Sequence, residues 1–286
     1  MIQAPSSRQH IADNISVSTM PFSDRENYSY NTDNPVHLVT EQPVLTFSID
    51  VDTASYSNVR RILNQGSLPP FDAVRVEEMI NYFSYDYAQP ESGPFSVYTE
   101  VGPSPFNAQK HLLHIGIQGD NLQDSTRPAA NLVFLVDVSG SMNSSDKLGL
   151  LKNALKMLSK QLTENDSVAI VVYAGAAGTV LEPTKGDNNT AINEALTRLS
   201  AGGSTNGGAG IELAYRLAKQ AFIKGGINRV ILATDGDFNV GTVDQQALKN
   251  KVEQQRKSGV SLSILGLGRG NYNDALMQEL AQNGNG

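Results

Sequence analysis

Apolar runs and helical repeats alternate along the second half of this chain. Leucines recur at helical spacing between the first two runs, from Leu148 to Leu162. Runs without in-and-out alternation are typical of strands that helices cover on both faces of a parallel sheet. The pattern therefore predicts an α/β fold with a doubly wound, mostly parallel sheet. The four apolar runs span residues 131–137, 167–175, 229–235 and 261–268.

The first half of the chain predicts a smaller α+β region. Residues 44–50 (VLTFSID) and two later runs, 95–102 and 111–119, have the composition of strands. Val59, Ile62 and Leu63 predict a helix that ends before the Pro69-Pro70 pair, and a second helix is expected from about Asp72. The predicted organisation is a flexible arm at 1–40, an α+β flanking region at 41–125 and the regular α/β domain at 130–286.

Composition excludes several classes of function. The formal net charge of -7 gives no basic surface for a phosphate backbone, so we expect no nucleic-acid partner. The absence of cysteine excludes disulfides, zinc-thiolate sites and cysteine nucleophiles. Apolar residues make up 40% of the chain, but no run approaches the length of a bilayer span, and the N-terminus lacks the pattern of a secretory signal.

Polar side chains gather where the predicted strands end. Asp137, Ser139 and Ser141 follow the first strand, Asp235 ends the third, and Thr205 lies in the glycine-rich loop 201–210. Because the carboxyl ends of parallel strands share one edge of the sheet, these side chains are expected to meet there. Two carboxylates and several hydroxyls suit a hard cation, with Mg²⁺ favoured over Mn²⁺ or Ca²⁺. Taken alone, the Asp-x-Ser-x-Ser motif also fits a helix cap.

These motifs resemble the metal-ion-dependent adhesion site of von Willebrand factor type A domains, which have a Rossmann-like fold. The resemblance covers about 130–286 and implies that Asp137, Ser139, Ser141, Thr205 and Asp235 bind the metal. It also implies a non-enzymatic protein that captures an Asp or Glu of a protein partner. The usual final strand of that family is expected to be missing after the ELAQNGNG ending.

The preceding stretch, SIDVDTASYSNVRRILNQGSLPPFDAVRVEEMINYF, resembles the flank of the bacterial YfbK-like lipoprotein group. The resemblance implies an extracytoplasmic location, periplasmic or in the cell envelope. Membrane attachment would then require a lipid anchor, which this cysteine-free chain is expected to lack.

A rival hypothesis is an enzyme. Asp50 and Asp52, in FSIDVDTAS, are similar to the nucleophile motif of haloacid-dehalogenase-like, Mg²⁺-dependent phosphatases. Asp235 and Asp237 would then be the late acidic pair, and Lys224 the phosphate-binding lysine. The simpler interpretation of Asp50 and Asp52 is a solvated strand end that feeds a helix N-terminus.

Overall fold

The computed structural model describes most of the chain, in eight ranges: 26–30, 34–46, 49, 52–121, 127–203, 207–236, 245–268 and 272–286. Its residues form two compact units, each of which is described by itself: one holds residues 31–83, and the other holds 84–286 together with 25–30. These units do not coincide with the three predicted segments, so the domain boundaries stay a prediction.

The regular secondary structure in the described part of the first unit is helical. It contains α1 (Ala54–Asn64), a 3₁₀ turn (Phe71–Ala73) and α2 (Val76–Asn81). The buried Glu78 joins the helices, because its carboxylate accepts a hydrogen bond from the Ser55 backbone N–H at 2.8 Å.

Two expectations for this unit need correction. The strand predicted at 44–50 is absent from its described residues, 44–46 and 49, which are exposed and outside any strand. Their apolar side chains face solvent rather than a sheet. The second helix begins at Val76 rather than near Asp72, because residues 71–73 form the separate 3₁₀ turn.

The second unit begins with an antiparallel hairpin of β1 (Phe95–Ser104) and β2 (Asn107–Gly119), which confirms both strands predicted there. One segment of the predicted N-terminal arm also belongs to this unit. The Asn27 backbone N–H donates to the Tyr272 carbonyl at 2.9 Å, and the Ala275 N–H donates to the Asn27 carbonyl at 3.2 Å. The arm is therefore anchored at this point.

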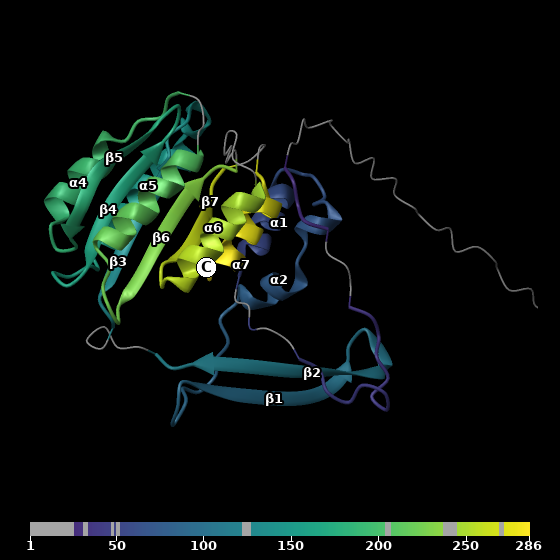
Figure 1. The fold of residues 1–286 in the computed structure, drawn as a ribbon. Helices are drawn as coiled ribbons and strands as arrows, with labels where there is room; N and C mark the ends of the chain where they lie inside the picture. The colour runs from purple at the N-terminus through teal and green to yellow at the C-terminus, as the bar shows by residue number, and fades with distance from the viewer. Residues whose placement is uncertain are drawn as a thin grey trace, which may run out of the picture. The chain divides into compact units, whose positions relative to one another are not determined.

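A five-stranded sheet forms the centre of the second unit (Figure 1), in the order β5-β4-β3-β6-β7. All neighbours are parallel except β4 and β5, which confirms the predicted mostly parallel α/β fold. The sequence pattern missed β5 because this edge strand is only partly buried and contains Pro183, which central strands exclude. The strands are β3 (Ala130–Asp137), β4 (Ser167–Tyr173), β5 (Ala177–Lys185), β6 (Ile227–Thr234) and β7 (Ser261–Gly266).

Helices cover both faces of this sheet. Side chains of β3 alternate between two apolar clusters: Phe134 shares one with residues of α3 and α4, whereas Val133 and Leu135 share the other with residues of α5, α6 and α7. The helices are α3 (Leu150–Ser159), α4 (Asn189–Arg198), α5 (Gly207–Gln220), α6 (Gln245–Lys257) and α7 (Asp274–Gly284). Among the helices that the structure describes, none has both the length and the apolar character needed to cross a bilayer.

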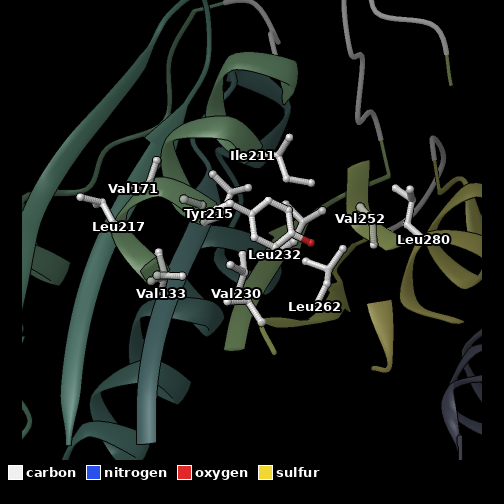
Figure 2. Packing of buried hydrophobic residues seen from close by; sticks show 14 of the residues in the cluster. Val133, Val171, Ile211, Tyr215, Leu217, Val230, Leu232, Val252, Leu262 and Leu280 are labelled. Carbon is white, nitrogen blue, oxygen red and sulfur yellow. The ribbon is translucent and has the colours of Figure 1, made fainter. Parts of the chain in front are cut away.

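Two polar features lie in and beside this core. The Tyr215 ring packs among Leu232, Leu262 and other aliphatic side chains (Figure 2), and its hydroxyl has no hydrogen-bond partner among the described residues. Asp166, just before β4, instead accepts bonds from the Arg127 guanidinium, from Thr163 and from the Ala130 N–H. Asp166 therefore joins the starts of β3 and β4, at the amino end of the sheet.

Replacing Tyr215 with Phe tests the cost of the unpaired hydroxyl. Tyr215→Phe should leave the free energy of unfolding unchanged or raise it by up to about 1 kcal/mol, because a buried hydroxyl without a partner is costly. Urea denaturation of both proteins measures this difference. A loss of more than about 1 kcal/mol would mean that the hydroxyl has a stabilising partner.

Asp166 should make stability depend on pH. Burial alone raises its pKa, but the bonds from Arg127, Thr163 and Ala130 outweigh burial and lower the pKa to about 2. An acid with a depressed pKa stabilises the fold above its unfolded value, near 3.9, and this stabilisation is lost as the pH falls towards 2. The contribution at neutral pH should be about 2 to 3 kcal/mol.

Asp166→Asn should therefore destabilise the protein at pH 7 and differ less and less from the native chain between pH 5 and pH 2. Urea midpoints across this range give the measurement. Asp187→Asn, which changes an exposed aspartate nearby, is the control and should show no such trend. A pH-independent difference for Asp166→Asn would show that packing, not charge, is responsible.

Candidate metal centre

The two neighbouring central strands of the sheet, β3 and β6, each end at an aspartate. Asp137 is the last residue of β3, and Asp235 directly follows β6; both are fully buried. The strands pair in parallel, with Val136 beside Ala233, so both carboxylates come to the same edge. This is the carboxyl edge, where α/β sheets usually bind ligands.

Several donors hold the Asp137 carboxylate. Its Oδ1 accepts from the Ser139 N–H at 2.8 Å, and its Oδ2 accepts from the hydroxyls of Tyr173 at 3.2 Å and Thr234 at 3.3 Å. Burial raises the pKa of Asp137, the bonds from Ser139 oppose this, and the charge of Asp235 raises it further. The negative charge of Asp235, next to the end of the neighbouring strand, thus disfavours the ionised form of Asp137.

The two serines of the motif project from the loop after β3. Ser139 is buried, Ser141 lies in a 3₁₀ turn (Gly140–Met142), and their Oγ atoms are 3.0 Å apart. The spacing of Asp137, Ser139 and Ser141 thus brings a carboxylate and two hydroxyls into one loop. A strand alone would not do this, because it would put all three side chains on one face several ångströms apart.

The start of the glycine-rich loop is bonded to this motif. The Gly202 N–H donates to the Val138 carbonyl at 2.7 Å, and the Gly140 N–H donates to the Gly203 carbonyl at 3.2 Å. Gly203 has a φ of 89°, which side chains disfavour, so a glycine is needed here. Thr205 lies outside the described residues, two positions after Gly203.

A lysine that the sequence analysis did not single out completes the described part of the site. Lys147, in a π-helical turn (Ser145–Gly149), places its Nζ 2.9 Å from Asp235 Oδ2 and 3.1 Å from the Ser141 carbonyl oxygen. Lys147 is only 9% exposed. Its position in SSDKLGL, between the serine motif and the first leucine of the helical repeat, was the available signal.

The chemistry of the donors fits a hard divalent cation. No three His, Cys, Asp or Glu side chains gather anywhere in the described ranges, so the donors at this edge are two carboxylates and hydroxyls. Such all-oxygen sets suit Mg²⁺, Mn²⁺ or Ca²⁺ rather than softer metals. The ammonium of Lys147 beside Asp235 shows that this edge already stabilises positive charge.

The phosphatase hypothesis gains no support from this geometry. Asp50 and Asp237 lie outside the described residues, and Asp52 is exposed just before α1. Lys224 precedes β6 whereas Asp235 follows it, so the eight-residue strand separates them by about 25 Å. The predicted pairing of Lys224 with Asp235 around one phosphate is therefore wrong.

Two family comparisons match this chain. Residues 22–114 match the family described as von Willebrand factor, and residues 132–237 match the von Willebrand factor type A domain. The class defined by the fold is thus that of von Willebrand factor type A domains, which are generally non-enzymatic adhesion or interaction modules. The chain belongs to the von Willebrand factor type A domain proteins and is YfbK-like, as its motifs implied.

Individual relatives match different shares of the chain. YfbK, an uncharacterized protein of Escherichia coli K12, is 51% identical over 267 residues, which are 91% of this chain and 46% of YfbK. Inter alpha-trypsin inhibitor heavy chain 4 of Mus musculus is 31% identical over 48% of this chain and 15% of its own length. This chain therefore spans less than half the length of either relative.

A solved structure with a similar fold is proximal thread matrix protein 1 from the mussel byssus, whose MIDAS motif is occupied by zinc. It is 23% identical, with a TM-score of 0.44, over 54% of this chain and 39% of its own.

The raised pKa of Asp137 predicts a cost in the metal-free protein. Folding disfavours the ionised form of such an acid, so the folded protein is less stable at pH values above the pKa of the acid in the unfolded chain. This loss of stability disappears as the pH falls below that pKa. Asp137→Asn should therefore unfold at the same or a higher temperature than the native chain at pH 7 without metal. The hydroxyls of Tyr173 and Thr234 can rotate to accept from the new amide.

Thermal unfolding in the presence of EDTA, followed by circular dichroism, measures this effect. The comparison should be repeated at pH 4, where the advantage of the asparagine should shrink. A clearly lower unfolding temperature for Asp137→Asn at pH 7 would contradict the prediction, because the negative charge would then be stabilising.

Proposed function

We propose that this protein binds a divalent cation, Mg²⁺ in the first place, at the carboxyl edge of its sheet and uses it to capture an acidic side chain of a protein partner. Asp137, Ser139, Ser141, Thr205 and Asp235 are the proposed ligands, with Asp235 acting directly or through water. Capture, rather than catalysis, is the proposed role.

The observation that carries the proposal is the arrangement of Asp137 and the two serines. The Asp137 carboxylate is fixed by three donors, and the Ser139 and Ser141 hydroxyls lie side by side in the next turn. A simple helix cap explains this poorly, since neither Asp137 nor Ser139 bonds to the first turn of α3 and Ser139 makes no side-chain cap bond to the 3₁₀ turn.

Hydroxyl ligands support binding of a further acidic group. Neutral Ser and Thr oxygens leave more of the cation's charge uncompensated than carboxylates do, so the metal would supply a strong electrostatic attraction for a carboxylate. The bonds from Gly140 to Gly203 and from Gly202 to Val138 support the assignment of Thr205, because they tie its loop to the serine loop.

The proposed location of this protein rests on the family resemblance. We propose an extracytoplasmic site of action, supported by the likeness to the YfbK-like group over 91% of this chain. Fractionation of cells that express the whole natural protein tests this. Recovery in the cytoplasmic fraction alone would contradict it.

Calorimetric titration of Mg²⁺ and Mn²⁺ into the metal-stripped chain tests the metal site. The native chain should bind one ion, and Asp137→Asn should lose at least about 90% of the affinity, since the loss of one buried anionic ligand commonly costs more than 1.4 kcal/mol. Asp50→Ala is the matched control and should bind as the native chain does. Loss of binding in Asp50→Ala alone would favour the phosphatase hypothesis instead.

Water-proton relaxation of the Mn²⁺-loaded protein tests the capture of a carboxylate. The bound ion should hold exchangeable water, and acetate should lower the relaxation enhancement by displacing it. A loaded protein with no exchangeable water would have a closed metal site, which would rule out capture through the metal.

A further inference from the structure

Within the described residues, the positively charged Lys147 contacts two members of the proposed ligand set. Its Nζ donates to Asp235 Oδ2 at 2.9 Å and to the backbone carbonyl of Ser141 at 3.1 Å. The Asp235 side chain is fully buried, and that of Lys147 is 11% exposed. The pair is therefore largely removed from water. Charges interact more strongly in such a low-dielectric environment than they do in water.

The fold holds the lysine stem in place. The π-helical turn positions Lys147 ahead of α3, and the loop after β7 passes directly over its aliphatic stem: a methyl group added at Gly268 would overlap the Lys147 Cε. Gly268 also has a φ of 75°, which favours glycine. The ammonium thus points to the metal edge because two separate segments confine the side chain.

The described side chains named at this edge carry more negative than positive charge. Asp137 and Asp235 would place two negative charges in a buried region, at the ends of two neighbouring strands. The ammonium of Lys147 compensates one of them without any metal. A divalent cation that binds here must share Asp235 with this ammonium, and the two positive charges repel each other.

We propose that Lys147 is a built-in competing cation, which holds the metal-free site together and sets a lower affinity for the divalent ion than the oxygen ligands alone would give. This inference rests on the proposed metal site. Metal and ammonium are linked through Asp235, so a change in one affects the binding of the other reciprocally. Asp235 Oδ2, already bonded to Lys147, is then less available to the metal. Less of the metal's positive charge is therefore neutralised by Asp235, and its attraction for an incoming carboxylate is stronger.

Three variants test this role by calorimetry and thermal unfolding. Lys147→Met removes the charge and the hydrogen bonds but keeps a flexible stem, and Lys147→Gln removes the charge but keeps a donor. Lys160→Gln removes the same charge from an exposed position at the end of α3 and serves as the control. Mg²⁺ is titrated into each metal-stripped protein, and unfolding temperatures are recorded with and without Mg²⁺.

Both Lys147 variants should bind Mg²⁺ about tenfold or more tightly than the native chain. Without metal they should unfold at lower temperatures, and Mg²⁺ should raise their unfolding temperatures by more than it raises that of the native chain. Lys160→Gln should match the native chain in both measurements. If Lys147→Met fails to fold, Lys147→Gln decides the question.

If the native chain binds Mg²⁺ and a folded Lys147 variant binds it equally or more weakly, this inference is overturned and the proposed metal site stands. If neither the native chain nor the variants bind Mg²⁺, the proposed function and the inference both fail. Binding by the Lys147 variants alone would support the competing ammonium and contradict metal binding by the native chain.

Discussion

The burial of two aspartates side by side is the constraint on which the candidate site depends. Asp137 and Asp235 end neighbouring parallel strands and are fully buried, so folding places two carboxylates where water cannot solvate them. Such groups must be compensated by hydrogen bonds or by positive charge. The surrounding loops meet this requirement: Ser139, Tyr173 and Thr234 donate to Asp137, and Lys147 pairs with Asp235.

The rest of the sheet makes this polar edge possible. β3 is buried along its whole length and contributes alternate side chains to the two apolar clusters that hold the helices on either face. A rigid strand of this kind fixes the position of the residue at its end. At the opposite edge, Asp166 joins the starts of β3 and β4 through Arg127 and Ala130. The carboxylates of the two edges thus have different roles, one structural and the other proposed to bind metal.

The comparisons and the geometry agree on the class of protein. The type A domain family matches residues 132–237, which include the serine motif, the glycine-rich loop and Asp235. The likeness to YfbK extends through the first unit as well, although this chain spans 46% of that protein. The chain thus belongs to a class of adhesion or interaction modules, and the metal at this edge of the sheet is proposed. In this structure Lys147 also contacts Asp235 at the same edge.

The sequence by itself determined the α/β class, the four parallel strands and the motif residues, because buried parallel strands leave continuous apolar runs and because Asp137 and Asp235 directly end two of them. It misjudged the described part of 44–50, residues 44–46 and 49, since a short apolar run has the same composition in a strand as in an exposed segment. It also missed β5, whose Pro183 and partial burial hide the edge strand. Only the tertiary structure separated Lys224 from Asp235 by the length of β6 and brought Lys147 to Asp235, 88 residues away. Contacts of that kind depend on how loops fold over the sheet, and the local sequence around Lys147 places it near the serine motif without indicating that it contacts Asp235.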